Sequence, residues 1–298
     1  MSSVDVSGSV AESELELSGL ITGLGWSHTL TIELRDQEKK PVVALESGQA
    51  VKFEFSEERY CIGSRPPGSS SLIPCPAGAV DIAGSQCEAC FAAALMLPCL
   101  RCDGSYCRNQ ARRDDCVQPD NHILYLASFG YADIKVGVAR VSRRVERLTE
   151  QGALLGLIVA RADGQIIRRY ESTIKRFGVA DKKTTREKLL SLDRRYDQQL
   201  LLEELYEKLF QLKERMRANW IEPEAVFVES RLAIELEHPP RLISAPGLKI
   251  EGTVLGLAGQ LILIDDGSQV VAVEGPSLVG RRSGPGESGA GSYQLGIF

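Results

Sequence analysis

Hydrophobic and polar residues alternate in short stretches near both ends of the chain. Residues 30–34 and 51–55 each place an apolar side chain at every second position, which is the period of a strand with one buried face. Further apolar runs after residue 225 predict more strands. These patterns predict an N-terminal β segment over residues 17–60 and a C-terminal β segment over residues 221–298. Each segment is too small to stand alone, so we expect the two to pair in one sheet or small barrel.

The pattern in the middle of the chain indicates a small α/β core over residues 121–190. The expected elements are strands at 122–129, 134–139 and 154–160 and helices at 141–151 and about 165–177. Beyond them, Thr184 and Glu187 have the spacing of a capping box, and apolar residues recur at helical intervals up to Trp220. We therefore expect a long amphipathic helix over residues 184–220, either packed across two domains or folded as a helical hairpin.

Composition distinguishes the remaining segments. All eight cysteines lie in residues 61–120, a segment that is rich in Gly, Pro and Ser and needs metal ions or disulfides to be ordered. Residues 1–16 are polar and acidic and predict a disordered tail. No apolar run reaches the roughly 18 residues of a membrane-spanning helix, and the N-terminus lacks the pattern of a secretory signal. We therefore expect a cytoplasmic protein with no membrane partner.

The spacing of the cysteines is typical of zinc sites. Two C-x2-C pairs each place two thiolates on one side of a tight turn, which suits a tetrahedral zinc ion. Eight thiolates match two four-thiolate sites, and a complete thiolate shell leaves no position for water, which indicates a structural role. One partition places Cys61, Cys75, Cys87 and Cys90 around one ion and Cys99, Cys102, Cys107 and Cys116 around the other.

Other arrangements of the cysteines remain open at this point. Interleaved partitions are equally compatible with the spacing. Four thiolates also serve an iron–sulfur cluster, and His122 could replace one thiolate. The remaining alternative is a disulfide framework or unligated thiols, but clustered cysteines in a reducing compartment are more often metal ligands.

The segment HILYLASFGYADIKVGVARVSRRVERLTEQGA resembles the start of a GIY-YIG nuclease domain. Tyr125 stands in the first strand motif, Lys135 opens the second, Arg147 follows on the next helix, and Glu171 lies on the helix after that. The resemblance implies a catalytic site in which the Tyr helps to activate water, the Arg stabilises charge on the phosphate and the Glu holds Mg²⁺ or Mn²⁺. Lys135 replaces the second Tyr of the motif, and a lysine that is mostly protonated is a poor substitute for a phenolic base.

The non-catalytic alternative assigns the same residues to packing. Tyr125 would pack at a strand end, and Glu171 would pair with Arg168 or Lys175 on its own helix. The fold would then be retained for binding alone.

The chain resembles still more closely an uncharacterised prokaryotic family, the domain-of-unknown-function family 2797. The shared features are C-x2-C knuckles followed by YLA-x-FG, KVG and R-x-x-EQGA, which here begin at Tyr125, Lys135 and Arg147. The likeness covers residues 60–190 well and the flanking β segments weakly, and it implies a fold but no activity. The expected class is α+β, with a Cys-rich zinc-knuckle region, a small GIY-YIG-like α/β core and flanking N- and C-terminal β segments.

The formal charge of −5 is unevenly distributed. Residues 101–190 hold 18 Lys and Arg against 11 Asp and Glu, a net of +7, and the remainder has a net of −12. An arginine stripe falls at helical spacing within this basic region: Arg140, Arg143, Arg144 and Arg147. Guanidinium groups bind phosphates bidentately, so this stripe favours contact with DNA or RNA. The alternative is a solvated face balanced by Glu146 and Glu150.

Together these observations predict a zinc-stabilised protein that contacts nucleic acid, with divalent-metal-dependent GIY-YIG-like phosphodiesterase activity as the enzymatic hypothesis. The alternative is a non-catalytic adaptor that binds nucleic acid or protein. A small-molecule or RNA-modifying enzyme is a third class. The sequence indicates no particular protein partner.

Overall fold

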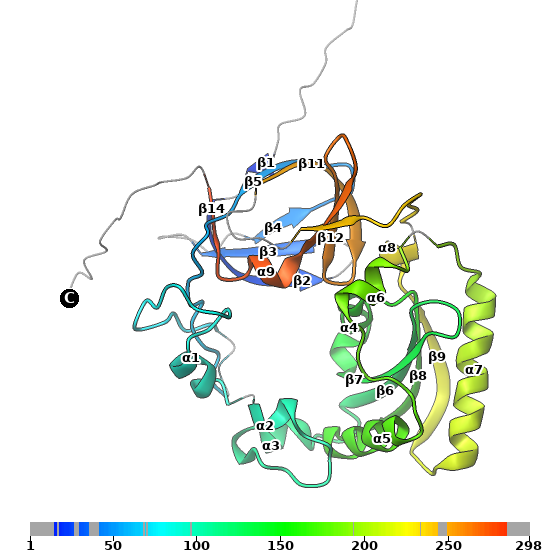
Figure 1. The fold of residues 1–298 in the computed structure, drawn as a ribbon. Coiled ribbons are helices and arrows are strands. Elements are labelled where there is room, and N and C mark those ends of the chain that lie inside the picture. Colours follow the sequence, from blue (N-terminus) through cyan, green and yellow to red (C-terminus); the bar gives the residue numbers. More distant parts are fainter. Residues whose placement is uncertain are drawn as a thin grey trace, which may run out of the picture.

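The computed structural model describes residues 15–16, 18–26, 30–35, 42–67, 69, 71–95, 97–192, 194–232, 234–243 and 249–284. These residues form helices and three β-sheets, which confirms the α+β class (Figure 1). Most of the predicted disordered tail lies outside the described residues, although Leu15–Glu16 form the short strand β1. None of the helices described is both long and apolar enough to cross a membrane.

The N- and C-terminal β segments pair with each other, as their small size predicted. One sheet has the order β1, β5 (Ala50–Glu54), β11 (Lys249–Ala258), β12 (Leu261–Asp265), β13 (Val270–Glu274) and β10 (Arg241–Ile243). The other has the order β14 (Arg282–Ser283), β2 (Gly19–Trp26), β3 (Leu30–Arg35) and β4 (Val42–Leu45). The β5–β11 ladder joins the two ends of the chain in antiparallel register.

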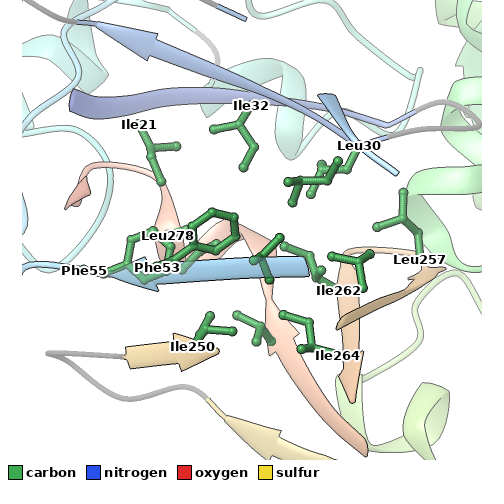
Figure 2. Close-up of a cluster of buried hydrophobic side chains, with 14 of the residues drawn as sticks. Ile21, Leu30, Ile32, Phe53, Phe55, Ile250, Leu257, Ile262, Ile264 and Leu278 are labelled. Atoms are coloured by element: carbon green, nitrogen blue, oxygen red, sulfur yellow. The ribbon is translucent and has the colours of Figure 1, made fainter. Parts of the chain in front are cut away.

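One apolar core lies between these two sheets, which we call the sandwich. Alternate residues of β3 are buried, as the period-two pattern predicts, so Leu30 and Ile32 face Phe53 and Ile262 of the other sheet. Figure 2 shows these side chains filling the space between the strands. The sandwich therefore depends on residues from both ends of the sequence.

The Cys-rich region connects the sandwich to the α/β core and has little regular structure. Its helices are all short: α1 (Glu88–Ala93), α2 (Leu97–Leu100), η1 (Gln110–Arg112) and α3 (Arg113–Cys116). Its second half lies against the core, because the backbone of Gly104 packs on helix α5 (Gly164–Arg176), and Arg169 of that helix donates a hydrogen bond to the Gly104 carbonyl at 3.3 Å.

The core contains the third sheet, which is antiparallel throughout. Its order is β7 (Ile134–Arg140), β6 (His122–Ser128), β8 (Leu155–Ala162) and β9 (Trp220–Phe227). Strand β9 was expected in the C-terminal β segment, and that expectation is wrong. It pairs with β8 instead, because almost every residue of β8 is buried and an open edge there would leave its backbone groups unpaired.

Helices cover both faces of the core sheet. Helices α5 and α7 (Gln198–Arg215) cover one face. Leu201, Leu205 and Leu209 of α7 belong to the buried apolar cluster on that face. Helix α4 (Arg144–Gln151), which follows the short helix η2 (Val141–Arg143), covers the other face with Leu148. Figure 1 shows α4 and α6 (Thr185–Leu189) between this sheet and the sandwich. Two more short helices, α8 (Glu229–Leu232) and α9 (Gly275–Leu278), lie in the C-terminal part.

The long amphipathic helix expected over residues 184–220, for which a helical hairpin was the alternative, is divided into two helices. The Thr184 capping box is present, but α6 ends at Leu189, and α7 begins only after Asp197. The Asp197 side chain accepts hydrogen bonds from the backbone of the first turn of α7, and its own N–H donates to the hydroxyl of Tyr131 at 2.7 Å. A new N-cap fixed by a tertiary contact therefore interrupts the helical pattern.

Candidate functional site

Four cysteines gather in the first half of the Cys-rich region. The sulfurs of Cys61, Cys75, Cys87 and Cys90 all lie within 4.8 Å of one another. They come from the loop after β5, from the loop before α1 and from α1 itself. Cys61 and Cys90 are buried, and the other two are partly buried. This group, the thiol cluster, could hold one metal ion, and it has the composition of the first predicted set.

The surroundings of the thiol cluster suit thiolate ligands. The backbone N–H groups of Gly63 and Cys87 donate to Cys61 Sγ at 3.4 and 3.2 Å, and such bonds favour the charged form of the sulfur. Two sulfurs at about 2.3 Å from a tetrahedral zinc ion would be about 3.8 Å apart. The sulfurs of Cys75 and Cys87 are 3.8 Å apart. All eight cysteines are free thiols, so the disulfide alternative is not seen.

The second predicted set is less closely gathered. Among the described residues, no three of Cys99, Cys102, Cys107, Cys116 and His122 have ligand atoms that all lie within 4.8 Å of one another. These thiols are nonetheless neighbours, and two of them accept hydrogen bonds: the N–H of Gly104 donates to Cys102 Sγ at 3.4 Å, and Asn109 Nδ2 donates to Cys99 Sγ at 3.1 Å. The buried Nδ1 of His122 has no hydrogen-bond partner in the described part of the chain.

A separate polar cluster lies on the face of the core sheet that α4 covers. Tyr125 on β6 is fully buried, and its hydroxyl accepts a hydrogen bond of 2.7 Å from Gln151 Nε2. Lys135 on β7 is only 7% exposed, and its Nζ donates to Gln151 Oε1 at 2.8 Å. One amide at the end of α4 therefore joins two of the predicted site residues. Burial raises the pKa of Tyr125 to about 12, so the phenol is neutral.

Gly137 makes room for the Tyr125 ring. The two residues are directly opposite in the β6–β7 ladder, and a Cβ on Gly137 would lie 2.4 Å from the Tyr125 hydroxyl oxygen and 2.5 Å from Cζ. The ring therefore occupies the space that a side chain at Gly137 would need. This contact explains the glycine of the KVG motif.

Arg147 on α4 and Glu171 on α5 lie in the same neighbourhood. Burial, followed by the positive charge of Arg147, lowers the pKa of Lys135 to about 8, and Glu171 acts on it in the opposite direction. The charge of Arg147 also lowers the pKa of Tyr125, and the charge of Glu171 raises it. Charges influence one another in this way only at short range in a poorly solvated region. Arg147 and Glu171 thus lie within electrostatic reach of Tyr125 and Lys135, and the four residues come from four different elements.

The Glu171 carboxylate has no partner among the described side chains. The non-catalytic alternative predicted an ion pair between Glu171 and either Arg168 or Lys175. Instead, Lys175 Nζ forms an ion pair with Asp181 Oδ2 at 2.6 Å. Burial raises the pKa of the Glu171 carboxyl, although the charges of Arg168 and Lys175 partly oppose that shift. With neither a hydrogen bond nor an ion pair in the described part of the chain, its oxygens are available to an external ligand.

Of the residues after Arg147, Glu150 balances arginines as the sequence-based alternative predicted, whereas Gln151 and Gly152 have roles that the sequence did not suggest. Glu150 is buried and accepts hydrogen bonds from Arg143 and Arg147. Gln151 holds the polar cluster together, and Gly152 ends α4 with φ of 73°. The Gly152 backbone lies against that of Gly259 in the β11–β12 turn of the sandwich, where a side chain would not fit. No local signal marks Gln151, because the burial of a polar side chain at a helix end depends on the elements packed against it.

The arginine stripe is not an open cationic face. Arg140 ends β7 and Arg143 belongs to η2, so the four residues do not share one regular helical face, contrary to the prediction. Each has a carboxylate partner: Arg140 with Asp115, Arg143 with Glu146 and Glu150, Arg144 with Glu224, and Arg147 with Glu150. The pairs of Arg140 and Arg144 and the Arg143–Glu146 pair are exposed and contribute little to stability, whereas Glu150, which Arg143 and Arg147 share, is buried. A polyanion would have to compete with all of these carboxylates.

Comparison with known proteins identifies the family of the chain. A family model described as "Protein of unknown function (DUF2797)" matches residues 48–276. Neither the curated proteins nor the solved structures contain a match to the chain. The matched residues include the thiol cluster and the polar cluster around Gln151. Because the match covers well over half of the sequence, the chain belongs to this family of proteins of unknown function.

Proposed function

We propose that this protein is a zinc-stabilised, nucleic-acid-contacting protein whose GIY-YIG-like core cleaves phosphodiester bonds with the help of Mg²⁺ or Mn²⁺. The observation that carries the proposal is that Gln151 joins Tyr125 and Lys135 by hydrogen bonds, with the charges of Arg147 and Glu171 within electrostatic reach of both residues. The chain order also supports it, since an antiparallel hairpin is followed by a helix with Arg147 and then by a helix with Glu171.

The residues of the polar cluster suit complementary roles. Glu171 fits a hard divalent ion, because its free carboxylate is the ligand such ions prefer and water completes their shell. When bound, the ion supplies a polarised phosphoryl oxygen and a more acidic water. Arg147 and Lys135 would donate to the phosphate oxygens and offset the negative charge that develops there.

Tyr125 has a different role from the one that the nuclease resemblance implies. The side chain is fully buried and its hydroxyl oxygen is held by Gln151, so it has no access to an attacking water. We assign it a positioning role, in which it fixes the Gln151 amide that in turn orients the ammonium group of Lys135.

The metal ions of the Cys-rich region complete the proposal. The thiol cluster would hold a structural zinc ion, since four thiolates leave no open position for water. The set Cys99, Cys102, Cys107 and Cys116 would hold a second ion and so tie the region to α5. Elemental analysis should give two zinc ions per chain. Iron together with acid-labile sulfide would indicate a cluster instead.

Replacement of Glu171 by glutamine should abolish metal-dependent cleavage. The amide keeps the size of the side chain but removes the charge that holds the ion, so we expect a rate loss on the order of 100-fold or more. Cleavage of labelled DNA and RNA of several structures, with Mg²⁺ and with Mn²⁺, measures the effect. The exposed Glu214→Gln variant on α7 is the matched control and should cleave like wild type. Absence of cleavage by the wild-type protein would rule out the enzymatic proposal.

A second candidate function is non-catalytic binding of nucleic acid. The complete burial of Tyr125 favours it, because the phenol is unavailable for chemistry. The cationic groups of the polar cluster would then hold a phosphate backbone without turnover.

Salt dependence of binding tests this second candidate. The slope of log affinity against log salt reports the number of phosphate contacts, so Arg147→Gln should weaken binding and reduce the slope by about 1. Fluorescence anisotropy with a labelled oligonucleotide between low and physiological salt gives the measurement. The exposed Arg217→Gln variant removes the same charge elsewhere and should bind like wild type. Equal slopes for wild type and Arg147→Gln would contradict a phosphate contact at this residue.

A further inference from the structure

His122 lies at the boundary between the core and the second set of cysteines. It begins β6 and shares the face of the core sheet that α5 covers with Leu124 and Leu126, because side chains alternate along a strand. Its Nδ1 is buried and has no hydrogen-bond partner in the described part of the chain. A buried polar atom without a partner is costly in a native fold, so this imidazole requires an explanation that packing alone does not give.

Cys116 meets His122 at the first residue of α5. A Cβ on Gly164 would lie 2.8 Å from Cys116 Sγ and 3.0 Å from His122 Nε2. Gly164 is helical and is not among the glycines with positive φ, so the conformation of the backbone does not require a glycine there. The glycine instead leaves room for the sulfur and the imidazole, which lie against the same backbone position.

The cysteine pair Cys99–Cys102 reaches the same turn of α5. The Cys102 N–H donates to the Cys99 carbonyl at 3.3 Å, which closes the tight turn of the pair. The Gly104 N–H donates to Cys102 Sγ at 3.4 Å, and a Cβ on Gly104 would lie 2.3 Å from the carbonyl oxygen of Gln165. Figure 1 shows α2 and α3, which contain Cys99 and Cys116, beside α5. Two pairs of metal-ligand groups therefore lie against the first turn of one helix.

Cys107 differs from these thiols in its hydrogen bond. Its Sγ donates to the Asn109 carbonyl at 3.5 Å, and that bond needs the proton of a neutral thiol. Cys99 and Cys102 instead accept hydrogen bonds from N–H groups, which favour the thiolate that binds metal. The contacts thus separate Cys107 from the other cysteines of the set.

The spacing of the remaining groups matches a known zinc pattern. From Cys99 to His122 the sequence reads C-x2-C-x13-C-x5-H. Zinc sites often combine a C-x2-C pair with a second pair about 12–15 residues later, whose two ligands are separated by about three to five residues. Cys116 takes the first position of that second pair, and a shell of three cysteines and one histidine is common among structural zinc sites. The four cysteines of the set give C-x2-C-x4-C-x8-C, which lacks this spacing.

We propose that the second zinc ion is bound by Cys99, Cys102, Cys116 and the Nε2 atom of His122, and that Cys107 is an unligated thiol. The inference rests on the second ion of the proposed function and replaces one of the ligands assigned to it there. Three thiolates and an imidazole close a tetrahedral shell, so the ion is structural. Because His122 opens β6, the ion ties the Cys-rich region to the strand that also contains Tyr125.

The zinc content of four purified proteins tests the ligand set. Wild type should contain two zinc ions per chain, and His122→Ala should contain one. Cys107→Ser should keep both ions, whereas a four-thiolate site predicts the loss of one. His238→Ala is the matched control, since it removes an exposed imidazole and should keep both ions. Circular dichroism shows whether each variant keeps its fold.

Thiol labelling of the native wild-type protein tests the same assignment without any substitution. Metal-bound thiolates are shielded from iodoacetamide, so Cys107 should be alkylated first, and Cys99, Cys102 and Cys116 should react only after a chelator is added. Peptide mass spectrometry locates the labels. X-ray absorption at the zinc edge should show nitrogen as well as sulfur around the metal. Protection of Cys107 equal to that of the other three, or a shell of sulfur alone, would overturn the inference.

The outcomes separate this inference from the proposed function. Loss of an ion from Cys107→Ser, with two ions retained in His122→Ala, would overturn the inference and leave the four-thiolate site. A single zinc ion in the wild-type chain would refute the second ion altogether. Two ions, one of them dependent on His122, together with no cleavage of nucleic acid would support the inference and refute the phosphodiesterase.

Discussion

Replacement of Cys90 by serine should release the metal ion of the thiol cluster and unfold the segment around it. Cys90 is buried on α1, and residues 61–95 have few apolar contacts of their own to hold them together. Structural zinc contributes about 10–16 kcal/mol in small zinc-binding peptides, so its loss should exceed the stability of this segment. We expect the zinc content to fall by one ion per chain and chymotrypsin, which cuts after aromatic residues such as Phe91, to cleave within residues 61–95. Elemental analysis and limited proteolysis measure both effects.

Cys99→Ser provides the matched control for the thiol cluster. The substitution is chemically the same, but Cys99 lies outside the group of four sulfurs. The variant should keep the metal of the thiol cluster and leave residues 61–95 protected from chymotrypsin. If Cys99→Ser exposes that segment as strongly as Cys90→Ser does, the cysteines share their metals in an interleaved way. Full metal content in Cys90→Ser would show that the cluster does not hold the ion.

Replacement of Gly137 by alanine should destabilise the core and disorder the polar cluster. The new methyl group would need the space of the Tyr125 ring, which lies 2.4–2.5 Å from the Cβ position and is fully buried. Overpacking of this kind costs about 1–3 kcal/mol. The ring can yield only by breaking its hydrogen bond to Gln151, which also orients Lys135. We therefore expect a lower urea midpoint together with loss of phosphate binding.

Two further variants show whether the Tyr125 contact is the cause. Gly84→Ala makes the same change where no atom lies within 4 Å of the Cβ position, and should stay within about 0.5 kcal/mol of wild type. In a Tyr125→Leu background, which removes the ring, Gly137→Ala should cost much less than in wild type. Additive effects in this double-mutant cycle would mean that the two residues do not interact.

The secondary structure of the sandwich and of the α/β core is largely predictable, because the sequence patterns that indicate it are local. The alternation in β3 and the apolar runs of β6 and β8 reflect which faces are buried, and the capping box at Thr184 depends on residues only three positions apart. The break between α6 and α7 was not predictable from periodicity. It depends on the contact of Asp197 with Tyr131, which is distant in sequence.

The candidate site residues also divide into those that a local sequence pattern marks and those that no such pattern marks. Tyr125, Arg147 and Glu171 were identified because they stand in recognisable motifs. Gln151 was missed, since an amide at a helix end has no motif that marks it. Its importance comes from neighbours on other elements, namely Tyr125 and Lys135.

The charge pattern shows where counting residues misleads. The sequence places four arginines at helical spacing, and the net charge of that region is positive. In the fold, each guanidinium has a carboxylate neighbour, and two of those carboxylates, Asp115 and Glu224, come from other elements. The more exposed cations are thus paired, whereas the buried Lys135 lacks an ion pair within the described residues.

By itself, the sequence determined the α+β class and a cysteine-rich region that could hold metal, because alternation, caps and C-x2-C spacing act over a few residues. Tertiary structure alone decided which four sulfurs meet, which strand closes the core sheet and which carboxylates pair with the arginine stripe. These outcomes depend on distances between groups far apart in the chain, and local patterns contain no information about those distances.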